Sequence, residues 1–182
     1  MPRIAPITGK SDVRPLDHHV VDGVIETFGN VRGPFSMLLH SPKLADRLLP
    51  LVKFFRDESV VEAPLRSIAV LTAVREREAA YVWSAQVGAA RRNGLREAVI
   101  DLLRAKGDPA ALPVDERDIV TYVRQLMRTN RTEQAVFDAL LGRHGVQWML
   151  ELTAAANYFA LLSGVVNAFE VAAPPDGDRL PA

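Results

Sequence analysis

The sequence predicts an all-α protein that forms one domain. Apolar residues recur at helical spacing along almost the whole chain, as at Leu65, Ile68 and Ala69, which places them on one face of a helix. No convincing run of alternating apolar and polar residues indicates a strand. The 182 residues are 48% hydrophobic and 24% charged, an ordinary globular balance that is sufficient for one buried core.

Residues that start and stop helices set the expected boundaries. Asp17 is a suitable N-cap for a first helix that ends near Phe28, because Gly29-Asn30 follows it. Ser41-Pro42 starts another helix, since serine caps the N-terminus and proline is tolerated in the first turn. The other helices are expected just after Gly33-Pro34 and over residues 62–77, 79–92, 96–106, 115–128, 132–142 and 146–171.

Three segments follow from this pattern. Residues 1–14 are expected to form an extended arm, because their prolines oppose a regular element. Residues 15–172 are expected to form the single helical domain, and residues 173–182 a flexible tail. The most apolar stretch, residues 153–169, is interrupted by asparagine, serine and glycine, so we expect a buried core helix rather than a membrane span.

The charge balance gives no reason to expect a nucleic-acid or membrane partner. Lys plus Arg equals Asp plus Glu at 22 each, so the formal net charge is zero. A neutral chain also does little to oppose self-association, which favours an oligomer. The N-terminal residues contain no apolar segment of the kind found in secretory signals, so a cytoplasmic location is expected by elimination.

The chain contains no cysteine. This absence excludes disulfides, thiolate metal sites and a cysteine nucleophile among its own side chains. Nor does the sequence contain a phosphate-binding glycine loop, a nucleophile elbow or a dinucleotide fingerprint. We therefore expect no cofactor and no metal.

Five segments with distinctive residues follow one another along the chain. They are residues 39–44 (Leu-His-Ser-Pro-Lys-Leu), 66–71 (Arg-Ser-Ile-Ala-Val-Leu), 81–86 (Tyr-Val-Trp-Ser-Ala-Gln), 90–95 (Ala-Arg-Arg-Asn-Gly-Leu) and 151–168. In this order they resemble the carboxymuconolactone decarboxylase family of the alkylhydroperoxidase D-like superfamily. Members of that family typically read Arg-Glu-Ile/Leu, then Tyr-Glu-Trp-x-x-His, then a small-residue helix that ends in Gly-Leu. The resemblance spans roughly residues 30–171.

The resemblance implies an all-α, alkylhydroperoxidase D-like helical bundle that is oligomeric. A trimer or hexamer is the expected assembly, with a dimer as the alternative, and the expected pocket lies near subunit contacts. Two chemistries are known in the wider family. One is lactone decarboxylation in aromatic catabolism, and the other is peroxide reduction through a Cys-x-x-Cys pair with a nearby Glu and His.

The family's functional positions carry different residues in this chain. Ser67 replaces the glutamate, Ala79 and Val82 replace the two cysteines, and Gln86 replaces the histidine. Peroxide reduction requires a thiolate to attack the O–O bond and a second thiol to resolve the product. The sequence therefore predicts that thiol peroxidase activity is absent.

The family's pocket is expected to keep its position with changed chemistry. Helical spacing places Ala79, Val82 and Gln86 on one face, with Trp83 beside them. Gln86 can donate and accept hydrogen bonds but cannot exchange a proton near neutral pH. The remaining expected pocket residues are Ser67, Tyr81 and Tyr158.

Two further residues are candidates for relocated proton transfer. His40 is one candidate, because histidine is the usual side chain for proton transfer near neutral pH, although it could instead be a local structural residue before the helix that starts at Ser41-Pro42. Glu78 could point its carboxylate into the pocket, or it could belong to a solvated hinge at residues 75–78. His144 at a helix end is better explained by capping, and the adjacent His18 and His19 lack a third metal ligand.

Together these features favour a cofactor-independent enzyme that acts on an aromatic-derived carboxylated or lactone compound, with His40, Glu78 and Gln86 as candidate catalytic residues. The alternative is a catalytically silent oligomer that binds a small ligand or serves as an accessory protein.

Overall fold

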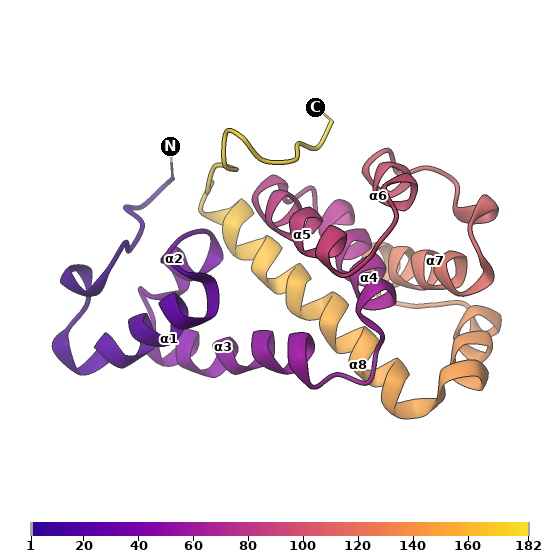
Figure 1. Ribbon diagram of the computed structural model, residues 1–182, viewed down its shortest axis with the longest axis horizontal. Coiled ribbons are helices and arrows are strands. Elements are labelled where there is room, and N and C mark those ends of the chain that lie inside the picture. The colour runs from indigo at the N-terminus through magenta and orange to yellow at the C-terminus, as the bar shows by residue number, and fades with distance from the viewer. Residues whose placement is uncertain (1, 182) are drawn as a thin grey trace.

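The computed structural model describes residues 2–181 and confirms the all-α prediction, with no strand among those residues (Figure 1). Along residues 2–181, eight α-helices and three short 3-10 helices follow one another. They are η1 (Lys10–Asp12), η2 (Pro15–Asp17), α1 (His18–Phe28), α2 (Pro34–Leu38), α3 (Pro42–Asp57), α4 (Ala63–Glu76), α5 (Ala80–Arg92), α6 (Glu97–Arg104), η3 (Pro109–Ala111), α7 (Val114–Thr129) and α8 (Gln134–Ala168).

Helix α4 forms the centre of the core. Every residue from Arg66 to Arg75 is buried, because α5, α6, α7 and α8 all pack against this helix. A helix that is covered on all sides needs no polar face, which explains its run of apolar and small residues. In Figure 1, α8 crosses the molecule between the group α1–α3 and the group α4–α7. This arrangement brings α2, α3 and α5 around the middle of the fold.

Helix α8 is two helical segments joined at Gly145. The backbone of Gly145 is non-helical, with φ 82° and ψ 173°, a conformation that glycine adopts without a steric penalty. The sequence predicted a break between residues 142 and 146, and the structure confirms it. By length and composition α8 could cross a membrane, but half of its most apolar window is buried within the protein, as in a core helix.

The arm differs from the extended segment that the sequence predicted, and the tail makes contacts that the sequence did not predict. The arm includes η1 and buries Ile7, and Arg3 forms an ion pair with Glu170 beyond the end of α8. The tail folds back so that Asp178 lies 2.7 Å from Nη1 of Arg91 on α5. Proline-rich composition did not reveal these contacts, because they depend on partners far away in the sequence.

Candidate functional site

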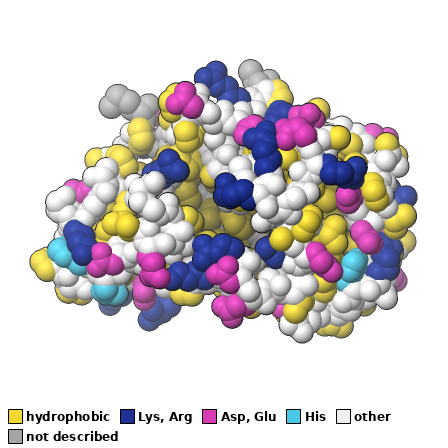
Figure 2. Space-filling model, in the orientation of Figure 1, with side chains coloured by type: hydrophobic (Ala, Val, Ile, Leu, Met, Phe, Trp, Pro, Cys, Tyr) yellow, Lys and Arg dark blue, Asp and Glu magenta, His cyan; other side chains and the backbone are white. Residues whose placement is uncertain are grey.

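A cavity of about 800 Å³ lies between α1–α3 on one side and α4, α5 and α8 on the other. Figure 2 shows a hollow on this face of the molecule, with hydrophobic side chains on its floor and Lys and Arg side chains around it. Such a volume accommodates a small organic molecule. The cavity is lined by Thr27, Phe28, Arg32, Pro34, Phe35, Val52, Phe55, Arg56, Arg66, Ser67, Val70, Leu71, Tyr81, Val82, Ser84, Ala85, Gln86, Ala89, Arg92, Asn93, Phe159, Leu162, Pro174, Asp176 and Gly177.

Helix α5 supplies one continuous wall of the cavity. Val82, Ala85, Gln86, Ala89 and Asn93 recur at steps of three and four residues, so they lie along one face of the helix and its C-cap. Alanine at two of these positions leaves space beside the helix. The opposite walls carry phenylalanine and aliphatic side chains from α1, α2, α3, α4 and α8, so the cavity is mainly apolar.

Tyr81 and Gln86 offer free polar groups to this apolar space. Neither side chain forms a hydrogen bond with another residue within 2–181. Burial raises the pKa of the Tyr81 phenol, with the charge of Arg32 opposing the change, so the phenol stays protonated at neutral pH. The Tyr81 hydroxyl can donate a hydrogen bond, and the Gln86 amide can donate or accept one. Both side chains are therefore suited to position a polar group of a ligand.

Ser67 and Asn93 form a fixed polar pair on the cavity wall. Ser67 Oγ donates to the carbonyl of Ala63 at 2.8 Å and accepts from Asn93 Nδ2 at 3.0 Å. The hydroxyl proton of Ser67 is therefore engaged by the backbone. With no base beside it, Ser67 is arranged as a structural and binding group rather than as a nucleophile.

Gly33 determines where the Tyr81 ring can lie. A Cβ at residue 33 would stand 2.2 Å from Cε1 and 2.7 Å from Cζ of Tyr81. Gly33 also has a φ of 61°, in the region that L side chains rarely adopt. The ring of Tyr81 packs directly on the backbone at the start of α2, which fixes it at the cavity wall.

The tail contributes the last part of the lining. Pro174, Asp176 and Gly177 line the cavity, and a Cβ at Gly177 would stand 1.8 Å from Oγ of Ser84 on α5. The ion pair of Asp178 with Arg91 lowers the pKa of the Asp178 carboxyl through their hydrogen bonds. The tail thus lies against α5 at the edge of the cavity.

Four of the predicted site residues meet at this cavity, namely Ser67, Tyr81, Val82 and Gln86. Ala79 and Trp83 are fully buried without lining it. Tyr158 is also buried and donates to the carbonyl of Leu48 at 3.0 Å, and burial raises the pKa of its phenol. Ala79, Trp83 and Tyr158 therefore pack in the core and support the helices that line the cavity.

Glu78 does not point into the cavity, which corrects the placement suggested by its position next to Ala79. Its carboxylate forms ion pairs with Arg75 and Lys106, away from the cavity lining. Partial burial raises the pKa of Glu78, but the hydrogen bond from Lys106 and the charge of Arg75 outweigh it, so the pKa is lowered. The ionised, paired carboxylate of Glu78 is therefore a surface contact at the junction between α4 and α5. This is the placement expected if residues 75–78 form a solvated hinge.

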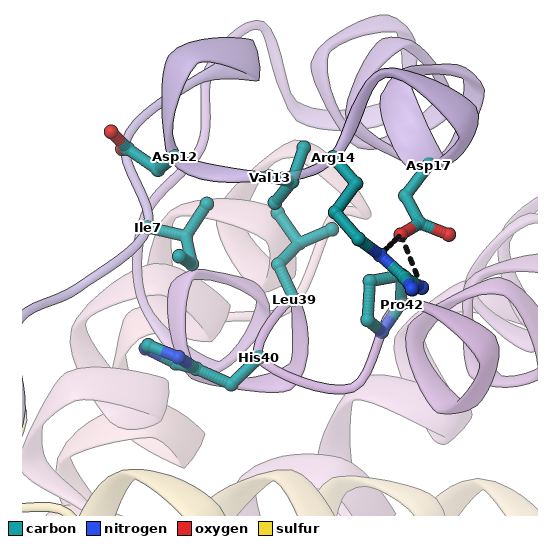
Figure 3. Close-up of a pocket in the computed structure, with 8 residues that line it drawn as sticks. All are labelled: Ile7, Asp12, Val13, Arg14, Asp17, Leu39, His40 and Pro42. Atoms are coloured by element: carbon teal, nitrogen blue, oxygen red, sulfur yellow. Dashed lines mark hydrogen bonds and ion pairs between the residues drawn. The ribbon is translucent and has the colours of Figure 1, made fainter.

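His40 lies in a different pocket, of about 260 Å³, between the arm and the start of α3 (Figure 3). Its Nε2 is 2.9 Å from the carbonyl oxygen of Ala5, so the ring attaches the arm to the domain. In the same pocket Asp17 is buried and paired with Arg14 at 3.0 Å, rather than capping α1 with its side chain. The structure therefore does not bring His40 together with Gln86.

Sequence reasoning missed Asn93, Arg66 and the tail as parts of this site. Asn93 could have been found, because it continues the Val82–Gln86 face by seven residues. Arg66 precedes Ser67, and the sequence alone marks it only as part of the Arg-Ser-Ile segment. The tail gave no local signal. Within residues 2–181 no group of three His, Asp or Glu side chains could hold a metal ion.

No protein-family model matches the sequence, and no curated protein matches it. Among solved structures, the debrominase Bmp8, determined as a variant in complex with 2,3,4-tribromopyrrole, superposes with a TM-score of 0.74 at 15% identity, over 96% of this chain and 95% of that chain. An uncharacterised peroxidase-related protein from Ralstonia eutropha, with an alkylhydroperoxidase AhpD core, gives a TM-score of 0.75 at 15% identity, over 95% of each chain.

A third structure, from Agrobacterium tumefaciens, is described as a protein of unknown function and a candidate antioxidant defence protein AhpD. It gives a TM-score of 0.67 at 15% identity, over 80% of this chain and all of that chain. These likenesses show that the chain has the AhpD-like fold, which the sequence predicted. At this identity they establish the fold alone.

Proposed function

We propose that this chain is a carboxymuconolactone decarboxylase-like protein that acts, without a cofactor, on an aromatic-derived carboxylated or lactone compound. The observation that carries the proposal is the apolar cavity into which Tyr81 and Gln86 present unengaged polar groups. An apolar space with a few convergent polar groups is the usual form of a small-molecule site. That the debrominase of the same fold was determined with a halogenated pyrrole supports a small ring compound as the ligand.

Thiol-dependent peroxide reduction is not part of this proposal. The chain holds no cysteine, and the AhpD-like fold does not itself supply a thiolate. Ala79 and Val82, at the positions of the family's cysteine pair, offer only carbon and hydrogen to a peroxide. The reduction of an O–O bond needs two electrons from a donor, and these side chains have none to give.

A second candidate function is ligand binding without turnover. The placement of His40 in a separate pocket and of Glu78 in a surface ion pair favours it, because neither proposed proton-transfer group lines the cavity. Among the lining residues the carboxylate of Asp176 and the phenol of Tyr81 are the groups that could exchange a proton. An enzyme would have to use these, whereas a binding protein would need neither.

A turnover assay separates the two functions. The purified protein is incubated with aromatic carboxylic acids and with lactones that carry a carboxylate, and products and released CO₂ are followed by mass spectrometry. We expect conversion that falls at least about tenfold in Tyr81→Phe, which removes only the phenol hydroxyl. The variant His40→Ala, at the other pocket, is the control and should keep the wild-type rate.

Three outcomes of this assay are informative. Binding of these compounds without conversion would establish the silent function instead. Equal loss of activity in His40→Ala and Tyr81→Phe would contradict the assignment to the cavity. Consumption of hydroperoxide by the protein with an added thiol-free electron donor would contradict the exclusion of peroxidase chemistry.

We also propose that the protein is a homo-oligomer, either a trimer or a hexamer. Val146 and Leu150 on α8 are 73% and 67% exposed, and Leu161 continues their side of the helix with 45% exposure. Burial against another copy would remove this apolar surface from water. We expect sedimentation to give a mass above the 20.0 kDa of one chain and Leu150→Asp to reduce it. A wild-type monomer at micromolar concentration would contradict the proposal.

A further inference from the structure

Arg66 is a buried cation that lines the cavity without a carboxylate partner. Its residue is 8% exposed, and no acidic group within residues 2–181 lies at ion-pair distance from it. Its Nη1 donates to the carbonyl of Val61 at 2.6 Å. Asp57 and Glu151 act on it only through longer-range attraction, and desolvation lowers the pKa of the guanidinium, which nevertheless stays charged.

The other buried arginine, Arg75, and the largely covered Arg124 are both paired. Arg75 forms an ion pair with Glu78 and donates to the carbonyl of Arg104. Arg124 lies 3.7 Å from Glu76 and donates to the carbonyl of Gly107. Neither of them lines the cavity. The buried arginine at the cavity wall is therefore the one without an ionic partner.

The remaining donors of Arg66 have no hydrogen-bond partner within residues 2–181. The buried side-chain nitrogens that lack a hydrogen-bond partner are Trp83 Nε1 and Arg124 Nε. Nε and Nη2 of Arg66 also have no protein partner, yet they are not among these enclosed atoms. They are therefore at least partly accessible, and Arg66 is one of the residues that line the cavity. A guanidinium with free adjacent N–H groups matches the geometry of a carboxylate.

Most of the other charges around the cavity are also positive. Arg32, Arg56 and Arg92 also line it, against the single carboxylate of Asp176. Arg56 is paired with Asp57, whereas Arg32 and Arg92 form no ion pair with the described part of the chain. An excess of positive charge around an apolar cavity attracts anions and raises their local concentration.

We propose that the ligand of this cavity is an aromatic carboxylate, whose carboxylate is bound by Nε and Nη2 of Arg66 and whose ring lies among the phenylalanine and aliphatic walls. This inference rests on the proposed function and adds its recognition step. An uncompensated buried charge is costly, and the anion supplies the missing partner. Arg66 acts as a binding and specificity residue, while Arg32 and Arg92 attract the anion.

The test compares 2-naphthoate with 2-naphthamide, which has a similar shape but no charge. Calorimetric titration of the full chain should give a dissociation constant for the naphthoate at least about tenfold lower than that for the amide. Arg66→Met should remove this preference while changing the affinity for the amide by less than about threefold. Arg66→Lys, which keeps the charge but not the paired donors, should restore part of the preference. Arg47→Met, at a fully solvated surface arginine, is the matched control.

The outcomes distinguish this inference from the proposed function. Equal affinities for both compounds in the wild type overturn the inference and leave a neutral-ligand cavity in place. A preference for naphthoate that persists in a folded Arg66→Met variant also overturns it. If neither compound binds, the inference fails, and the proposed function is then decided by the turnover assay. Wild-type preference is measured without any variant, so a misfolded Arg66→Met protein would not prevent a decision.

Discussion

Gly33→Ala is expected to destabilise the protein by about 2–5 kcal/mol, through overpacking against a rigid ring and an unfavourable backbone conformation. The new Cβ would stand 2.2 Å from Cε1 of Tyr81, and the ring is too well buried to move without displacing its neighbours. Urea denaturation gives the change in the free energy of unfolding. Because the Tyr81 phenol is part of the cavity wall, the same variant should bind cavity ligands more weakly.

Gly29→Ala is the matched control for this prediction. Gly29 has a similarly positive φ of 80°, but a Cβ there would meet no atom within 4 Å. It therefore measures the backbone contribution without the clash. The double variant Gly33→Ala/Tyr81→Ala should lower the free energy of unfolding by less than the sum of the two single effects, because the ring that causes the clash is then absent. If Gly33→Ala were no more destabilising than Gly29→Ala, Tyr81 would not pack on this backbone.

The sequence predicted the helices well because their signals are local. Proline at the start of α2 and α3 and the glycine break at residue 145 specify boundaries from neighbouring residues. The cavity face of α5 was also predictable, since Val82 and Gln86 lie on it by helical spacing alone. A resemblance in five weak segments correctly anticipated the AhpD-like fold.

The placement of Glu78, His40 and the tail could not be predicted in this way. The direction of the Glu78 side chain depends on a φ of 51° and on Lys106, 28 residues later. His40 is held by Ala5 in an arm that the sequence presented as extended. The tail is attached by Asp178 to Arg91, 87 residues before it. Each placement depends on a tertiary partner, which neither periodicity nor motif spacing reveals.

The proposed function depends on the binding of small molecules in the cavity beside α5, and among the proposed variants Ala85→Trp is expected to have the largest effect on that binding. Ala85 lines the cavity and its side chain is accessible, so an indole at this position can occupy the ligand space without entering the core. Ala98→Trp, at an exposed position of α6, adds the same side chain away from the cavity and away from the exposed apolar side of α8. Both variants should keep the wild-type unfolding midpoint.

The deciding measurement is calorimetric titration of 2-naphthoate, or of any compound that the turnover assay identifies, into both variants. We expect the heat of binding to disappear in Ala85→Trp, because the indole fills the space between α5 and the phenylalanine walls, and to remain unchanged in Ala98→Trp. Undiminished binding by a folded Ala85→Trp protein would contradict the account, because the ligand would then bind elsewhere.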